Sequence, residues 1–229
     1  MSNRTICHSW VARTTAAPDN GRERLMMRNI VACLWFFIVI CAASGCGAAR
    51  PVKYYQLTVP ADRPASSESA QYPVTLLIGP LKASHLYRED RIVYGSAGEQ
   101  MGTYEHHRWA EPPTEMIETT LLHTLRATGH FQSVAPLTSN SHGDFLLRGQ
   151  LYDFKEVSGN GFAARLTLEL EMRDVKMGQT VWTHYYTYDE PVSGKEVPTV
   201  VAALNRNVHR ANEEISSSLN QYFAAHPPR

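Results

Sequence analysis

Histidine is the residue type in this sequence that first suggests chemistry, because an imidazole can bind a metal ion or act as a general base. Of the ten histidines in the 229-residue chain, His107 lies two positions after Glu105 and directly after His106. His142 lies two positions before Asp144. A metal centre typically needs three or four convergent ligands, and neither group offers that many. We therefore predict that these side chains are solvated polar residues and that the chain holds no metal site.

The familiar catalytic and nucleotide-binding patterns are missing as well. The sequence contains no GxSxG, HExxH or SxxK, no P-loop and no dinucleotide-binding glycine fingerprint. Residues 158–161, "SGNG", are typical of a hairpin turn, since no helix follows that could cradle a phosphate. We predict that the protein is not an enzyme and needs no soluble cofactor. A catalytic site scattered along the chain is the alternative.

Cys46 is the other candidate for chemistry, because a thiol can be acylated. It ends the run Ala43-Ser44-Gly45-Cys46, which resembles the bacterial lipobox. In that motif the cysteine receives diacylglycerol, the leader is cut before it, and the new amine is often acylated. The four cysteines of the chain are Cys7, Cys33, Cys41 and Cys46. A chain cut before Cys46 therefore offers it no disulfide partner, and we expect covalent diacylglycerol and N-acyl lipid there. An incidental cysteine behind a cleaved signal is the alternative.

The residues before Cys46 have the pattern of a cleavable leader. An apolar stretch of about 14 residues, 30–43, matches the core of a signal peptide and is shorter than the roughly 20 residues of a membrane span. Met26 and Met27 are alternative starts that would give a conventional short leader. The basic residues ahead of the apolar stretch are Arg22, Arg24 and Arg28.

Cleavage before Cys46 would divide the sequence into three parts. We assign residues 1–45 to a signal peptide, 46–52 to an acylated tether and 53–229 to one folded domain, which is long enough for a hydrophobic core. The whole chain has 22 basic and 22 acidic residues, of which the leader holds five and two. The remainder therefore has 17 against 20, a formal charge of −3. This mildly acidic balance argues against nucleic acid as a partner.

Strand patterns recur along the whole domain. The clearest is in residues 162–175, where four apolar side chains alternate with charged and hydroxyl ones, as in a half-buried antiparallel strand. In 74–81 the apolar run is expected to stop at Gly79-Pro80. The segments that we predict to be strands are 52–59, 74–81, 91–95, 100–110, 131–137, 144–157, 162–175 and 180–189.

Two segments have helical periodicity. The first begins at Pro112-Pro113 and is stopped by Gly129. The second, 199–224, carries apolar residues at spacings of three and four, and we expect this stripe to pack on the sheet. A partner-binding groove along it is the alternative. Together the elements predict an α+β fold in two layers, a mostly antiparallel sheet with two helices packed on one face.

Segment 180–189 carries aromatic residues on both of its faces. Trp182, His184, Tyr186 and Tyr188 share one face, and Tyr185 lies on the other. Two such faces exceed what a two-layer domain must bury, and tyrosine and tryptophan are favoured at protein interfaces. Core packing accounts for any single residue, but the set suggests that the sheet meets another surface.

Five ordered motifs resemble one family. They are "YYQL" soon after Cys46, "REDRIVYG", "RWAEPP", "LRATGHFQSV" and "DFLLRGQLYDF". In this order they resemble the ABC-type transport auxiliary lipoproteins, which include the lipoprotein of the paraquat-inducible membrane-integrity operon. The resemblance covers roughly residues 46–225. The departures are "EPP", where an aliphatic residue commonly follows "EP", and Ala43 at lipobox position −3.

The resemblance implies a non-catalytic partner of a transport system. Such lipoproteins accompany mammalian-cell-entry (MCE) domain proteins, an ABC permease and an ATPase that are thought to move phospholipid or other hydrophobic molecules across the periplasm. Gly47 and Ala48, rather than Asp, follow Cys46, which by resemblance to enterobacterial sorting implies the outer membrane, facing the periplasm. By the same resemblance the partner-binding residues would be Tyr94, Trp109, Glu111 and Pro112; a purely fold-defining role is the alternative.

Two other functions stay open from the sequence. The "DFLLRGQL" opening also resembles parts of outer-membrane lipoproteins that build secretion or envelope-integrity complexes, so a structural subunit is the second interpretation. A membrane-anchored hydrolase is the third. The oligomeric state is open too, and a homo-oligomeric ring that matches a symmetric MCE partner is one option.

Overall fold

A computed structural model of the chain describes residues 20–43, 50–61, 70–96, 100–159, 161–194 and 196–228. Its contacts divide the chain into one unit of residues 1–50 and a second of residues 51–229. In the first unit, helix α1 (Asn20–Ala43) includes the apolar stretch 30–43. None of the helices in the described ranges is long and apolar enough to cross a bilayer. Cys46 lies outside the described residues, and so do Gly47 and Ala48.

The second unit is built on one eight-stranded sheet. The first four strands precede helix α2, the next four follow it, and helix α3 closes the chain. Their bounds are β1 (Lys53–Tyr55), β2 (Tyr72–Ala83), the short 3-10 helix η2 (His85–Tyr87), β3 (Arg91–Ser96), β4 (Met101–Trp109), α2 (Pro113–Thr128), β5 (Phe131–Pro136), β6 (Phe145–Ser158), β7 (Phe162–Asp174), β8 (Thr180–Val192) and α3 (Val197–Ala225).

Strand β6 is the centre of the sheet, because it joins three neighbours. Its whole length pairs antiparallel with β7, which pairs antiparallel with β8. Its other edge is divided: residues 145–151 pair with β2, and residues 155–158 pair with β3. Beyond these, β5 pairs with β2. On the other branch β4 pairs with β3, and the short β1 pairs with β4. The sheet therefore splits into two branches on one side of β6.

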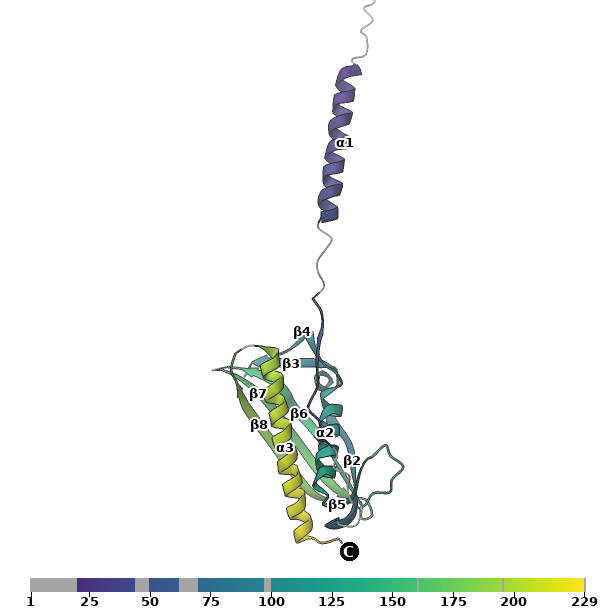
Figure 1. Ribbon diagram of the computed structural model, residues 1–229, viewed down its shortest axis with the longest axis vertical. Helices are drawn as coiled ribbons and strands as arrows, with labels where there is room; N and C mark the ends of the chain where they lie inside the picture. Colours follow the sequence, from purple (N-terminus) through teal and green to yellow (C-terminus); the bar gives the residue numbers. More distant parts are fainter. Residues whose placement is uncertain are drawn as a thin grey trace, which may run out of the picture. The chain divides into compact units, whose positions relative to one another are not determined.

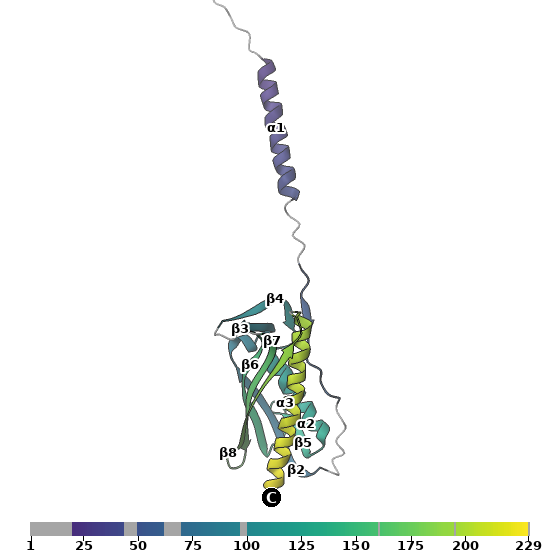
Figure 2. The ribbon, with the colours of Figure 1, turned by 90° about the vertical axis from the view of Figure 1, so that its left-hand side faces the viewer.

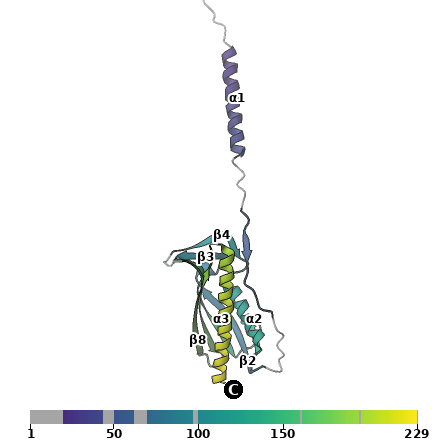
Figure 3. The ribbon, with the colours of Figure 1, turned by 60° about the vertical axis from the view of Figure 1, so that its left-hand side comes forward.

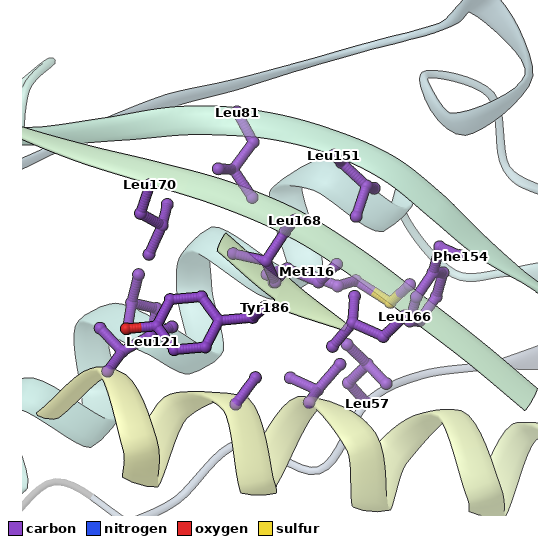
Figure 4. Packing of buried hydrophobic residues seen from close by; sticks show 14 of the residues in the cluster. Leu57, Leu81, Met116, Leu121, Leu151, Phe154, Leu166, Leu168, Leu170 and Tyr186 are labelled. Atoms are coloured by element: carbon purple, nitrogen blue, oxygen red, sulfur yellow. The ribbon is translucent and has the colours of Figure 1, made fainter. Parts of the chain in front are cut away.

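Helices α2 and α3 lie side by side on one face of this sheet (Figure 1), as the view turned by 90° also shows (Figure 2). Between helices and sheet lies the hydrophobic core (Figure 4), to which β6 and β7 contribute residues such as Leu151, Leu166 and Leu168, each at most 1% exposed. The two-layer α+β fold predicted from the sequence is confirmed. The ladders β6–β7 and β7–β8 are the longest and are antiparallel, whereas the pairings of β2 and β3 with β6 are parallel.

The helix ends follow from the residues that occupy them. Pro113 opens α2, where its missing N–H costs no hydrogen bond, and Glu115 in the first turn complements the positive end of the helix dipole. Gly129 closes α2 with φ of 67°, a left-handed conformation that glycine adopts without strain. In α3 the predicted apolar stripe is buried, with Leu204 and Leu219 inaccessible to solvent. This stripe is core, as expected, and is not open to a partner.

Two predicted strands have different lengths in the structure. The segment 52–59 forms a strand only at Lys53–Tyr55; after it the chain leaves the sheet, buries Leu57 and donates the Thr58 N–H to the Asn205 side chain at 2.8 Å. Strand β2 does not stop at Gly79-Pro80 but continues to Ala83, because a register shift between Ile78 and Leu81 accommodates the two residues.

The aromatic face of β8 is largely covered within the same chain, and of its four aromatic residues His184 alone is exposed. Tyr186 and Tyr188 are buried, Tyr188 donates its hydroxyl proton to Glu214, and the Trp182 Nε1–H donates to Ser218 at 3.2 Å. The second surface that this face meets is therefore α3. On the opposite face Tyr185 is 58% exposed.

Candidate functional site: an aromatic row and a groove at one end of the domain

Tyr94, the first of the predicted partner-binding residues, lies at one end of a row of four rings. Its side chain is 42% exposed and makes an edge contact with Tyr104, at 5.0 Å between ring centroids. Tyr104 contacts His107 at 5.9 Å, and His107 stacks on Tyr55 at 5.7 Å. The Tyr55 hydroxyl and His107 Nδ1 are 2.9 Å apart. The row crosses β3, β4 and β1, and we call these four residues the aromatic row.

A buried carboxylate lies beneath the aromatic row. Glu156 is 5% exposed and accepts a hydrogen bond from the Tyr104 hydroxyl at 2.7 Å. Burial, together with this hydrogen bond, raises the pKa of Tyr104, so its hydroxyl stays a donor across the physiological range. Burial and the nearby charges of Lys53 and His106 lower the pKa of His107. The row therefore presents neutral rings with polar edges at neutral pH.

Trp109 belongs to the core rather than to a surface. Its side chain is 1% exposed and packs on Phe154, at 5.3 Å between ring centroids. Its backbone N–H donates to the Asp90 carbonyl at 2.6 Å, and Arg108 before it forms an ion pair with the Asp90 carboxylate at 2.8 Å. Trp109 thus fixes the end of β4 and offers no side-chain atoms to a partner that binds this form.

Glu111 and Pro112 lie where β4 passes into α2. Pro112 is the N-cap of α2, and its carbonyl accepts the Met116 N–H at 3.1 Å. Glu111 is exposed and lines a groove of about 510 Å³. The other residues that line the groove are Gln56, Leu57, Thr58, Val59, Ala110, Met116 and Thr119. A slot with an apolar floor and one carboxylate at its rim fits an aliphatic side chain next to a positive charge.

The aromatic row and the groove are adjacent in the structure. The row ends at Tyr55, and the next residue, Gln56, begins the wall of the groove. The Ala110 N–H, next to Glu111, donates to the Tyr55 carbonyl at 2.7 Å, which ties the two features together. The structure therefore brings Tyr94, Glu111 and Pro112 to the same end of the domain, formed by β1, β3, β4 and the start of α2 (Figure 3).

The histidines considered for metal binding do not converge. His106 lies 3.8 Å from Glu105 in an exposed pair, while His107 takes part in the aromatic row. Asp144 accepts the Thr75 N–H at 2.7 Å, and His142 is exposed. Within the described ranges no three side chains of His, Cys, Asp or Glu come close enough to hold a metal ion.

Sequence reasoning missed three members of the aromatic row. Strict alternation along a strand puts Tyr104 and His107 on opposite faces, since they are three positions apart. The register of β4 against β3 shifts between Arg91 and Val93, and this irregularity lets both rings lie on one side. Tyr55 joins them because β1 pairs in parallel with β4, and parallel neighbours cannot be deduced from local pattern. The clustering of aromatic residues in 100–110 was the one available signal.

A family model describes most of this domain. The model of the ABC-type transport auxiliary lipoprotein component matches residues 55–216, from the aromatic row to the middle of α3. The chain belongs to this family. Its members are auxiliary lipoproteins of ABC-type transport systems, which makes this protein a lipid-anchored component of the cell envelope. No curated protein matches the chain.

Solved structures share the fold of this auxiliary lipoprotein. Protein XCC0632 from Xanthomonas campestris is 20% identical, with a TM-score of 0.68 over 76% of this chain and 98% of that one. The crystal structure of an uncharacterized protein is 14% identical, with a TM-score of 0.60 over 74% of this chain and 99% of that one. At these identities the likeness establishes the fold alone.

Proposed function

We propose that this auxiliary lipoprotein is a non-catalytic docking component of an envelope system that contains an MCE-domain protein, an ABC permease and an ATPase. The system would move phospholipid or other hydrophobic molecules across the periplasm, with this protein held at the outer membrane by lipid on Cys46. The observation that carries the proposal is the family match over residues 55–216, together with the surface on which Tyr94 and Glu111 are exposed.

The anchor supports docking by confining the domain. Two or three acyl chains hold a protein firmly on a bilayer, whereas one chain holds it only marginally. The seven residues of 46–52 reach at most about 25 Å, so β1 stays close to the membrane surface. Confinement of this kind raises the effective concentration of the docking surface near a membrane-bound partner, so each contact can be weak.

The chemistry of the groove indicates what a partner would present. Val59 is 43% exposed, Met116 closes the apolar floor, and Glu111 supplies a negative charge. A partner segment with a leucine or valine next to a lysine or arginine would fill the slot and pair with the carboxylate. Tyrosine rings of the aromatic row would extend the contact, because tyrosine gives a large contact area at low entropic cost.

The test is capture of the acylated protein from detergent-solubilised envelopes, followed by mass spectrometry. We expect the wild-type protein to bring down an MCE-domain protein and its permease, and Cys46→Ala to lose them because tethering is removed. Recovery of secretion or envelope-integrity proteins in place of the MCE components would support the structural-subunit alternative and overturn this proposal.

A matched pair of variants tests the groove itself. Val59→Arg places a charge in the slot, whereas Val175→Arg places one on a valine of similar exposure (49%) at the β7–β8 turn. We expect Val59→Arg to abolish capture of the partner and Val175→Arg to leave it unchanged, with the same far-ultraviolet circular dichroism for both. Equal capture by both variants would show that the groove is not the docking site.

A further inference from the structure

Strand β8 forms one margin of the sheet (Figure 1). In the described part of the chain it pairs with β7 alone, so its outer edge carries backbone N–H and C=O groups without a neighbouring strand. Natural edge strands are usually protected by proline, charged side chains or a bulge. From Trp182 to Tyr188 the sequence WTHYYTY contains no proline, lysine, arginine, aspartate or glutamate. Its register with β7 is continuous over these residues.

The order of residues along this edge is nearly the same in both directions. Counted outward from Tyr185, Thr183 matches Thr187, and His184 matches Tyr186. One step further, Trp182 matches Tyr188. A strand with this order can pair antiparallel with a copy of itself, so that hydroxyl faces hydroxyl and ring faces ring. Threonine pairs and aromatic pairs are among the favourable cross-strand neighbours.

The exposed side chains on this strand agree with such a pairing. His184 is exposed although it stacks between Trp182 and Tyr186, with ring centroids 5.5 Å and 5.1 Å away. Against a second copy, His184 would lie opposite the Tyr186 of that copy, and the row of rings would continue across the junction. Tyr185, 58% exposed, would meet its own counterpart on the other face of the sheet.

The charges next to this segment do not oppose the pairing. Asp189 is held by Arg165, with two hydrogen bonds of 2.7 Å, and Glu190 is paired with Arg206 at 2.9 Å. In the same register these carboxylates would face Val181 and Thr180 of the second copy, so no like charges would be placed opposite each other. Helix α3 contacts β8 from the face of the sheet, through Ser218 and Glu214, and not across its edge.

We propose that two copies of this chain associate through their β8 strands, antiparallel and centred on Tyr185. The contact is isologous, with the same strand on both sides of a two-fold axis. It extends the two sheets into one continuous sheet, with an α3 helix from each copy on the same face. The partner is a second copy, because the edge is complementary to itself. This inference is independent of the proposed transport partner.

Engineered cysteines test the register. No cysteine follows Cys46, which carries lipid in the proposed processed form, so the wild-type chain gives the background. Opposite residues in an antiparallel pair have β-carbons about 4.5–5.5 Å apart, which a disulfide can span. We expect Tyr185→Cys, oxidised in isolated envelopes, to shift to twice the monomer mass on a non-reducing gel, with the shift reversed by reductant.

A second pair of variants excludes random collision. Thr183→Cys or Thr187→Cys alone would place like cysteines four residues out of register, about 13 Å apart, too far for a disulfide. Chains carrying one or the other, expressed together, would cross-link to each other. We expect monomer for each alone and dimer for the mixture; cross-linking of each variant alone, or none in the mixture, would overturn the proposal. These two variants still decide the outcome if Tyr185→Cys fails to fold.

A charge at the two-fold axis gives an independent readout. Tyr185→Lys would bring two ammonium groups together, and sedimentation in detergent should shift from dimer to monomer. The matched control is Tyr54→Lys, at a tyrosine that is 65% exposed on β1, and it should remain a dimer. A wild-type protein that sediments as a monomer at all concentrations, or a Tyr185→Lys protein that stays dimeric, contradicts the β8 pairing.

Discussion

At Gly149 strand β6 leaves no room for a side chain beside β7. A β-carbon built on this glycine would lie 2.0 Å from the carbonyl oxygen of Glu169 and 2.7 Å from the side chain of Leu170. No side chain fits at that distance, so the two strands must move apart if one is introduced. The glycine of the "LRGQL" motif is therefore a packing requirement of the central ladder.

We predict that Gly149→Ala lowers the free energy of unfolding by about 3 kcal/mol, the upper end of the usual cost of overpacking, because the clash is with backbone. The control is Gly161→Ala, where a β-carbon meets nothing within 4 Å and the change should stay within about 0.5 kcal/mol. Urea denaturation followed by circular dichroism measures both. Equal midpoints for the two variants would mean that the strands can separate here without cost.

The Arg165–Asp189 pair predicts a pH dependence. Two hydrogen bonds from Arg165 hold the pKa of Asp189 below its ordinary value of 3.8. A carboxyl whose pKa is lowered by folding stabilises the protein above that ordinary value, and the contribution is lost as the pH falls through the lowered pKa. Asp189→Asn should therefore be less stable than the wild type at pH 7, with the difference shrinking as the pH falls below 3.8.

Thermal denaturation of wild type and Asp189→Asn between pH 7 and pH 2 checks this expectation. Because the pair is partly exposed, 0.5 M salt should reduce the difference at pH 7. A difference that stays constant across the pH range would show that the asparagine acts through shape and not through charge.

At the scale of elements, helix α3 connects one side of the sheet to helix α2. It packs on β7 and β8 and also on α2, and its buried stripe runs from Val200 to Phe223. Asn207, buried in the middle of this stripe, donates to the Ala164 carbonyl at 2.8 Å. The helix is therefore fixed in position along β7 by a hydrogen bond as well as by apolar contact.

We predict that Leu204→Ala, at a side chain with no solvent exposure, lowers the free energy of unfolding by about 2–5 kcal/mol. Glu213→Ala on the exposed side of the same helix should change it by less than about 0.5 kcal/mol. Chemical denaturation distinguishes the two. A small loss for Leu204→Ala would show that the core can collapse around the missing side chain.

Elements were predictable where a local pattern determines them. Alternation in 162–175 gave β7, and the proline start and glycine stop gave α2, each within about two residues. The partners of β6 were not predictable, because β2 and β3 join its edge in parallel from more than 60 positions away. The candidate site follows the same division: Tyr94 and Glu111 were found from motifs, whereas Tyr55 and His107 needed the β1–β4 pairing. Burial of Trp109 was not visible in its motif.

At the scale of the whole molecule, residues 51–229 form one unit with one core, which predicts a single cooperative transition. The unit contains two tryptophans, one on each side of β6: Trp109, in the branch of β3, β4 and β1, packs on Phe154, and Trp182, on β8, is hydrogen-bonded to Ser218 of α3. In protein that lacks the proposed leader, Trp109→Phe and Trp182→Phe each leave one tryptophan, which reports on one side of β6 at a time.

We expect the fluorescence of each single-tryptophan protein in urea to follow the same transition as its own circular dichroism. Two separate transitions within one protein, with the Trp109 signal changing before the ellipticity, would instead show that the branch of β1, β3 and β4 unfolds on its own. In that case the aromatic row and the groove would lie on a branch that is less stable than the rest of the domain.

The central position of β6 affects the order in which the strands of the sheet can pair during synthesis. Strand β2 ends at Ala83, whereas β6, which must lie between β2 and β7, begins at Phe145, 62 residues later. A ribosome that adds about 5–20 residues per second leaves an interval of roughly 3–12 seconds in which β2 and β3 exist without the strand that joins them. A chain delivered N terminus first must therefore wait with the β6-facing edges of β2 and β3 unpaired, and any chaperone that protects these edges would have to act within those seconds.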